Sequence, residues 1–124
     1  MSVFPTAYFG SIAYFRSILA AELVHIEAKE HFVKQSIRTR CTILGANGKQ
    51  HLSIPVEKPL GSKTPMDQLI ISHTENWQKD HWKSIESAYA SSPYFDAYDR
   101  EVKELIYSEE RNLLHFNTHI TQAI

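Results

Sequence analysis

Residues 31–56 carry the pattern that most restricts the fold: two runs of alternating apolar and polar side chains joined by a short turn sequence. In the first run, the odd positions carry the apolar side chains Val33, Ile37, Cys41 and Ile43. The dipeptide Asn47-Gly48 lies between the runs and is typical of two-residue hairpin turns, because both residues accept a positive φ angle. Alternation with a period of two is typical of a strand that buries one face. The sequence therefore predicts an antiparallel β-hairpin over 31–56.

The turn and the alternation together predict the register of this hairpin. With Asn47 and Gly48 as the turn residues, the apolar side chains of both strands fall on one face. Cys41 is then expected to be a small buried side chain that does not react. The predicted cross-strand pairs are Ile43 with Leu52, Cys41 with Ile54, Thr39 with Val56 and, on the opposite face, Thr42 with Ser53.

The N-terminal region predicts a strand, a helix and a second strand. Residues 3–9 and 24–26 are rich in β-forming side chains. Between them, Ser11 can cap a helix over 12–23. A strand–helix–strand order predicts that the two strands lie parallel. The apolar face of the helix carries Ile12, Phe15, Leu19 and Leu23.

The C-terminal half predicts one short strand, at 68–72, and then three helices. From Trp77 onward the apolar period becomes 3.6, and His81 lies on this stripe, which favours a hydrogen-bonded core histidine. Ser92-Pro93 and Ser108 are suitable starts for the next two helices. A chain of 124 residues is the size of one domain. The predicted class is α/β, with α+β as the alternative: a small mixed sheet that contains the hairpin, one early helix and about three C-terminal helices.

The composition excludes several classes of protein. One cysteine excludes a disulfide framework, and His115 with His119 supplies two of the usual four zinc ligands, so no metal and no cofactor is expected. The net charge of −1 argues against nucleic acid as a partner, and no apolar stretch approaches the ~18 residues of a membrane span. The N-terminus lacks the layout of a signal peptide, so we expect a cytoplasmic protein. The sequence contains no glycine-rich phosphate loop and no nucleophile motif, so it indicates no particular reaction. Whether the chain is an enzyme stays open.

The polar face of the predicted hairpin is the candidate binding site. Residues 1–62 hold seven Lys/Arg and four Glu, a net charge of +3, and 63–124 hold six Lys/Arg and ten Asp/Glu, a net charge of −4. Cations on alternate positions of one strand project to the same side at ~6.6 Å intervals. One interpretation is an anion-binding row, because Arg suits phosphate or carboxylate. The other is a solvated face whose cations pair with nearby carboxylates, which composition and spacing alone favour. The residues concerned are Lys34, Ser36, Arg38 and Arg40, with Glu27 and Glu30 as neighbours.

Two blocks of residues, in order along nearly the whole chain, form a specific joint pattern. The first holds Tyr14-Phe15, Glu27, Glu30, Phe32, Lys34-Gln35-Ser36, Arg38, Arg40-Cys41, Gly45-Ala46-Asn47-Gly48, Leu52 and Ile54-Pro55-Val56. The second holds Trp77, His81-Trp82, Ser84, Ala88-Tyr89, Ser92-Pro93-Tyr94-Phe95 and Tyr98. This pattern resembles the WbqC-like protein family. The family usually has Arg-Asn-Arg where this chain has Arg38-Thr39-Arg40, which puts any contribution of the Asn to a site in doubt. Family members generally continue further, so we expect 1–124 to be a single WbqC-like domain that is C-terminally incomplete relative to the family.

The resemblance implies a part in bacterial surface-polysaccharide biosynthesis, because the family takes its name from O-antigen gene clusters. Its members largely lack an assigned reaction. Since the block residues between Lys34 and Arg40 concentrate on positions that alternation directs away from the core, the resemblance favours the anion-binding row, with a sugar phosphate or sugar nucleotide as the ligand. The alternative is a non-catalytic binding or scaffold subunit of a polysaccharide-assembly complex. A binding site for a small molecule requires a concave pocket with convergent polar groups, and a scaffold requires an exposed apolar patch. A homo-oligomer is compatible with either function.

Overall fold

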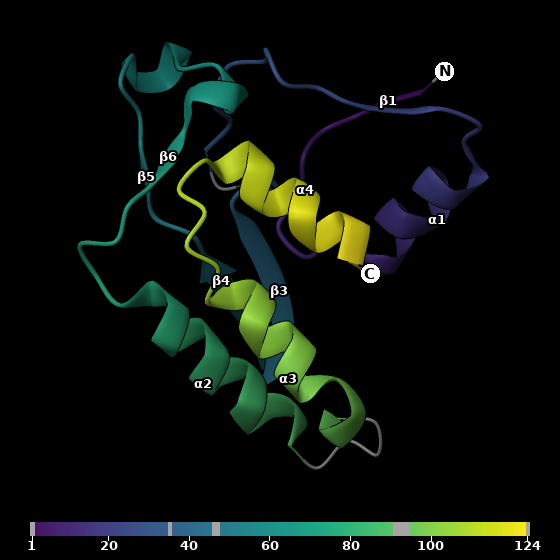
Figure 1. The fold of residues 1–124 in the computed structure, drawn as a ribbon, viewed down its shortest axis with the longest axis vertical. Coiled ribbons are helices and arrows are strands. Elements are labelled where there is room, and N and C mark those ends of the chain that lie inside the picture. The colour runs from purple at the N-terminus through teal and green to yellow at the C-terminus, as the bar shows by residue number, and fades with distance from the viewer. Residues whose placement is uncertain (1, 35, 46–47, 91–94, 124) are drawn as a thin grey trace.

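The structure is a computed structural model that describes residues 2–34, 36–45, 48–90 and 95–123, and within them it contains four α-helices, two short 3-10 helices and six short strands (Figure 1). In chain order these are β1 (Ser2–Phe4), α1 (Ile12–Ala20), β2 (Val24–Ile26), β3 (Arg40–Gly45), β4 (Gly48–Ser53), β5 (Val56–Glu57), η1 (Gly61–Lys63), η2 (Met66–Gln68), β6 (Ile70–Ile71), α2 (Trp77–Tyr89), α3 (Phe95–Ile106) and α4 (Leu113–Ala123). The predicted mixed α/β class, with one early helix and three late ones, is confirmed.

In the described part of the chain, the strands form three separate two-stranded sheets rather than one mixed sheet. β1 and β2 pair in parallel, as the strand–helix–strand order predicted. β3 pairs with β4, and β5 with β6, in antiparallel fashion. Pro55 separates β4 from β5, and because proline has no N–H group it cannot donate to a continuing ladder.

The hairpin is shorter than predicted. β3 begins only at Arg40, and the chain before it bends through a turn. The Ser36 carbonyl accepts hydrogen bonds from the N–H groups of Thr39 and Arg40 at 3.2 and 3.0 Å, and the Ser36 hydroxyl donates to the Val33 carbonyl at 2.9 Å. Such local bonds of serine compete with a strand ladder. Val33 and Ile37, predicted to face the core, are accordingly 42% and 47% exposed.

The register of the hairpin differs from the prediction by two residues. Cys41 pairs with Leu52 rather than with Ile54, and Gly45 pairs with Gly48, so all four predicted cross-strand pairs are wrong. Gly48, predicted inside the turn, begins β4 with a φ of 107°, which glycine adopts without strain. The predicted turn residue next to it, Asn47, lies outside the described residues. A slip of two residues keeps every side chain on its face, and Leu52 is buried as predicted.

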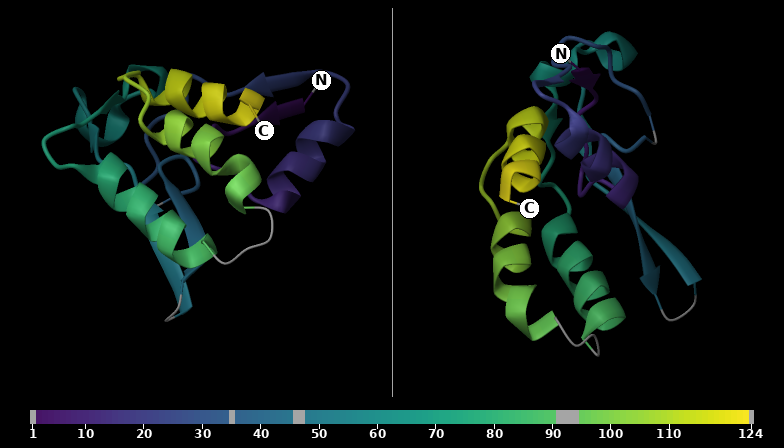
Figure 2. Two further views of the ribbon diagram at one scale, coloured as in Figure 1. Left: turned by 60° about the horizontal axis from the view of Figure 1, so that its bottom comes forward. Right: turned by 90° about the vertical axis from the view of Figure 1, so that its right-hand side faces the viewer.

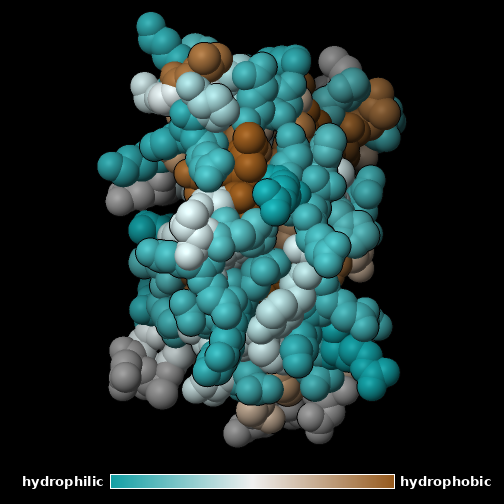
Figure 3. Space-filling view, turned by 60° about the vertical axis from the view of Figure 1, so that its left-hand side comes forward, coloured by the Kyte–Doolittle hydropathy of each residue, from teal (hydrophilic) through white to brown (hydrophobic). Residues whose placement is uncertain are grey.

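The core lies where the hairpin meets the three C-terminal helices. α2 and α3 pack side by side, and the hairpin lies along α2 (Figure 2). The face seen in Figure 3 is mainly hydrophilic, with small hydrophobic areas in its upper half. The largest fully buried hydrophobic side chains are Tyr8, Met66, Leu69, Ile106, Leu113, Phe116 and Ile120.

Helix α1 begins as predicted but contributes no buried side chain. The Ser11 hydroxyl accepts a hydrogen bond from the Tyr14 N–H at 3.1 Å, which confirms the predicted cap. The helix ends at Ala20 and lies at one edge of the molecule (Figure 1). Its predicted inner face is open to solvent, with Ile12 82% and Leu19 84% exposed.

The predicted cap of α4 is wrong. Asn112, rather than Ser108, caps α4, because its Oδ1 accepts a hydrogen bond from the His115 N–H at 3.1 Å. The Ser108 hydroxyl instead accepts from the Glu110 N–H within the preceding turn. The predicted start Ser92-Pro93 of α3 lies outside the described residues.

Candidate functional site

The predicted cations do not share one strand face, since only Arg40 lies in β3. Arg38 forms a two-pronged ion pair with Glu30, in which Nε donates to Oε1 and Nη2 donates to Oε2 at 3.1 Å. These side chains are largely buried, with 17% and 25% of their surface exposed. The Arg38 carbonyl also accepts a 2.7 Å hydrogen bond from Asn117 Nδ2 of α4. Arg38 is therefore held by its side chain and by its backbone.

The other residues of the predicted row have separate surroundings. Lys34 is exposed on the turn before β3. Ser36 forms that turn through the bonds described above. Glu27 accepts a hydrogen bond from the backbone N–H of Lys29 at 2.8 Å. The prediction of four side chains at regular strand spacing is therefore wrong, because its premise of a strand from 31 to 39 is wrong.

Arg40 is the predicted residue that projects from the hairpin itself. It is half-buried, and its Nε donates to the Ser53 hydroxyl, across the hairpin, at 3.3 Å. Among the residues that the structure describes, no carboxylate forms an ion pair with it. Its two terminal amino groups are therefore available to donate parallel hydrogen bonds to a carboxylate or phosphate.

His81 links three segments that are distant in the sequence. Its Nε2 lies 3.1 Å from the Ser53 carbonyl oxygen, and its Nδ1 lies 2.9 Å from the Tyr8 hydroxyl. A carbonyl can only accept, so Nε2 carries the proton, and in the neutral ring Nδ1 accepts from Tyr8. Burial lowers the pKa of His81, against the opposing effects of the Ser53 carbonyl and Asp80. The predicted hydrogen-bonded core histidine is confirmed.

A small cleft opens beside His81 at the base of the hairpin. Its volume is about 270 Å³. The carboxylates of Glu75 and Asp80 are exposed at this cleft, and Trp77 is buried in its wall. Trp77 Nε1 is buried with no partner among the described residues. We call it the His81 cleft; it is lined by Ser53, Ile54, Pro55, Glu75, Trp77, Asp80 and His81.

Cys41 lies in β3 opposite Leu52 and packs against the core. It is half-buried rather than fully buried. Burial raises the pKa of its thiol to about 12, so the thiol stays protonated at neutral pH. Protonated thiols are poor nucleophiles, which agrees with the expectation of an inert cysteine.

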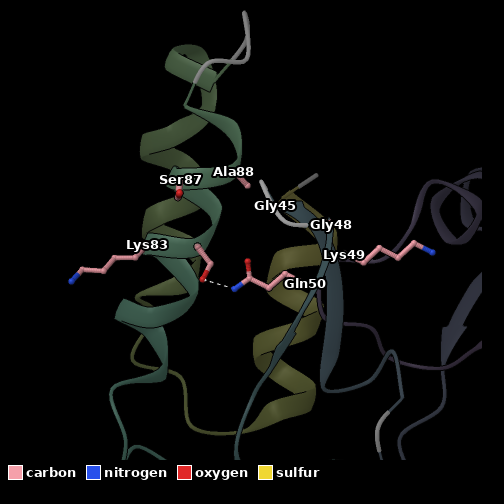
Figure 4. A pocket seen from close by; sticks show the side chains of 8 residues that line it. Gly45, Gly48, Lys49, Gln50, Lys83, Ser87 and Ala88 are labelled. Atoms are coloured by element: carbon pink, nitrogen blue, oxygen red, sulfur yellow. Dashed lines mark hydrogen bonds between the residues drawn. The ribbon is translucent and has the colours of Figure 1, made fainter.

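A second and larger cleft lies between the hairpin tip and α2 (Figure 4). Its volume is about 520 Å³. Gln50 Nε2 donates to the Ser84 hydroxyl at 3.0 Å and so connects the two walls. These two residues are 34 positions apart, and no local sequence pattern joins them. We call it the hairpin–helix cleft; it is lined by Gly45, Gly48, Lys49, Gln50, Lys83, Ser84, Ser87 and Ala88.

Within the described residues, no group of three or more His, Cys, Asp and Glu side chains is arranged to hold a metal ion. His115 and His119 share an exposed face of α4 beside Glu110. None of the helices described has both the length and the apolar character needed to span a bilayer.

Comparison with known proteins returns one result. No curated protein and no solved structure matches the chain. The model of the WbqC-like protein family matches residues 6–124, which is nearly the whole sequence. The resemblance seen in the two blocks of residues is thereby confirmed, and the chain belongs to the WbqC-like protein family.

Proposed function

We propose that the protein binds a phosphorylated or nucleotide-linked sugar at Arg40 and the His81 cleft, as part of bacterial surface-polysaccharide biosynthesis. The observation that supports this proposal is that the two blocks of family-like residues meet at Ser53. Arg40, from the first block, bonds to the Ser53 hydroxyl, and His81, from the second, bonds to the Ser53 carbonyl.

The chemistry of this region suits a ligand with two different parts. The Arg40 guanidinium can donate parallel hydrogen bonds to a phosphate. The carboxylates of Glu75 and Asp80 accept hydrogen bonds, as sugar hydroxyls require. A cleft of about 270 Å³ is slightly smaller than typical ligand pockets of ~300–1,000 Å³. It suits one sugar ring, with the phosphate or nucleotide outside it near Arg40.

The remaining predicted site residues take supporting roles in this proposal. Arg38 and Glu30 hold the segment that carries Arg40, and the Ser36 carbonyl fixes the start of β3 by accepting from the Arg40 N–H. Lys34 adds a positive charge to the surface that an anion approaches. This electrostatic attraction weakens with salt, because exposed charges are screened over about 10 Å at 0.1 M ionic strength.

Two arginine variants test the proposal. We expect Arg40→Ala to weaken binding of glucose 1-phosphate about tenfold or more, as for a lost charge-assisted hydrogen bond, with little change in melting temperature. We expect Arg38→Ala to lower the melting temperature. Arg100→Ala, an exposed arginine of α3, is the matched control. If Arg38→Ala and Arg40→Ala both lose stability and neither loses binding, the arginines are a structural network and the proposal is wrong.

The alternative, a scaffold subunit of a polysaccharide-assembly complex, is favoured by one observation. Helix α1 has no buried residue, and its exposed apolar side chains Ile12 and Leu19 lie along a shallow groove with Phe15. Exposed apolar patches of this kind mark protein interaction sites. If this function is correct, Leu19→Glu releases the protein from the complex, whereas Arg40→Ala does not.

A further inference from the structure

We infer that the outer edge of β4 is a docking site for an extended, acidic segment of a partner protein, which adds to the hairpin as a third strand. The inference goes beyond the proposed function, because it concerns a protein partner rather than a small ligand. It depends on the register of the hairpin, on the exposure of β4 and on the charge of the hairpin.

The register of the hairpin determines which backbone groups of β4 point away from β3. Paired residues in an antiparallel ladder alternate between pairs that exchange hydrogen bonds and pairs that do not. In this register Ile54 lies opposite Thr39, and the Ile54 N–H donates to the Thr39 carbonyl at 2.8 Å, so this pair is of the bonded kind. By alternation, Lys49, His51 and Ser53 belong to pairs of the other kind, and their backbone groups point outward.

Two contacts made by other groups agree with this assignment. Leu44 lies opposite Lys49, and its N–H donates away from β4, to the Tyr89 hydroxyl at 3.4 Å. The Ser53 carbonyl oxygen lies 3.1 Å from His81 Nε2, on α2. Both the Leu44 N–H and the Ser53 carbonyl are groups that the alternation directs out of the ladder.

The outward groups of Lys49 and His51 are open to a partner. Both residues are exposed, and no backbone group of the described residues bonds to the outward N–H or carbonyl of either. β3 and β4 form a sheet of their own in the described part of the chain. A strand edge with free N–H and C=O groups is a template for a further strand. An added antiparallel strand can form two hydrogen bonds with each of these residues.

The charge of the hairpin favours an acidic partner. Arg40 and Lys49 lie on the face opposite the buried Leu52, and the Lys49 side chain extends away from α2 (Figure 4). β3 and β4 contain no carboxylate, and neither cation forms an ion pair within the described residues. Residues directly opposite each other in a ladder share a face, so an Asp or Glu opposite Lys49 forms a cross-strand ion pair. A second copy of this chain, paired antiparallel through β4, would instead add two cations and no carboxylate to the same face.

The test is amide hydrogen exchange of the isotope-labelled chain, measured by NMR with and without a β-forming acidic peptide, Thr-Val-Glu-Val-Glu-Val-Thr. The control peptide has lysine in place of both glutamates. We expect the acidic peptide at saturation to slow exchange of the Lys49 and His51 amides about tenfold or more, because each gains a hydrogen bond. The Gln50 and Leu52 amides, which already bond to β3, should change little.

Two variants of the edge separate the charge from the backbone bonds. Lys49→Glu should weaken binding of the acidic peptide about tenfold and strengthen that of the lysine peptide, because an attractive cross-strand pair becomes a repulsive one. Lys63→Glu, the same charge change at an exposed residue of η1, is the matched control and should leave both affinities unchanged. His51→Pro removes one outward N–H and should weaken binding of both peptides; if this variant does not fold, the result for Lys49→Glu decides.

Three outcomes would overturn the inference. If the Lys49 and His51 amides become protected as the protein concentration rises, without peptide, a second copy occupies the edge. If the acidic peptide binds without protecting these amides, or if Lys63→Glu weakens its binding as much as Lys49→Glu does, the association depends on net charge alone. If neither peptide binds at millimolar concentration, Lys49 only protects the edge from pairing.

Discussion

Removal of the Tyr8 hydroxyl tests the hydrogen-bond chain that joins the N-terminal segment to α2 and the hairpin. In the structure, the hydroxyl donates to His81 Nδ1 at 2.9 Å, and His81 Nε2 donates to the Ser53 carbonyl at 3.1 Å. Tyr8 is 1% exposed and His81 is 6% exposed. In Tyr8→Phe the ring is retained, so the packing changes little, but His81 Nδ1 becomes a buried acceptor without a donor.

The size of the effect follows from that unpaired acceptor. A buried polar atom left without its partner costs about 1–3 kcal/mol. The entropy of unfolding is ~2.1 cal/mol/K per residue, or about 0.26 kcal/mol/K for 124 residues. The melting temperature of Tyr8→Phe should therefore fall by about 4–12 °C.

Thermal unfolding followed by circular dichroism at neutral pH measures this shift. Tyr98→Phe is the control, because that tyrosine is 59% exposed and its hydroxyl makes no hydrogen bond within the described residues. We expect Tyr98→Phe to melt close to the unmodified protein. If Tyr8→Phe also melts close to the unmodified protein, the Tyr8 hydroxyl contributes no net stability. The reasoning that His81 Nδ1 becomes a costly unpaired acceptor is then wrong.

Three further predictions follow. Because burial lowers the folded-state pKa of His81 below its usual 6.5, the unfolded chain binds this proton first as the pH falls. The contribution of neutral His81 to the free energy of unfolding is therefore complete above pH 6.5 and is lost as the pH falls below it. Calorimetry should show that acid pH lowers the free energy of unfolding less in His81→Gln than in the unmodified protein. Glu30→Gln leaves the largely buried Arg38 guanidinium with a weaker partner and should lower the melting temperature by about 4–8 °C, measured against exposed Glu104→Gln. With a thiol pKa of about 12, Cys41 should react with a thiol reagent at pH 8 at least about a hundredfold more slowly than free cysteine; rapid labelling would contradict its placement.

The sequence predicted the faces of the hairpin better than its length or register. Alternation defines which side each residue takes, and a slip of two residues preserves that side. Leu52 is therefore buried although its predicted partner Ile43 was wrong. The length was wrong because alternation continues through Ser36, whose own hydrogen bonds favour a turn. That competition depends on local energetics that a binary pattern does not contain.

The candidate sites were predictable only in part, because both clefts are formed by residues distant in the sequence. The bond between Gln50 and Ser84 and the bond between His81 and Ser53 join α2 to the hairpin over 34 and 28 positions. Composition and periodicity contain no information on such pairs. The sequence predicted Arg40 as a binding residue but His81 only as a core histidine, and it is the fold that brings both to the same residue, Ser53.

The two arginines of the Arg38-Thr39-Arg40 sequence show how far a local pattern can assign a role. Both arginines lie at even positions and carry the same charge, so the alternation pattern predicts the same role for each. In the structure, the Arg38 guanidinium is matched by Glu30 and the Arg38 carbonyl accepts from Asn117, whereas the Arg40 guanidinium, among the described residues, donates only through Nε, to the Ser53 hydroxyl. A cation already paired with a carboxylate must lose that partner before it binds a phosphate, and a cation beside a hydroxyl does not. The residue better suited to bind an anion is therefore Arg40, and the residue better suited to hold it in place is Arg38.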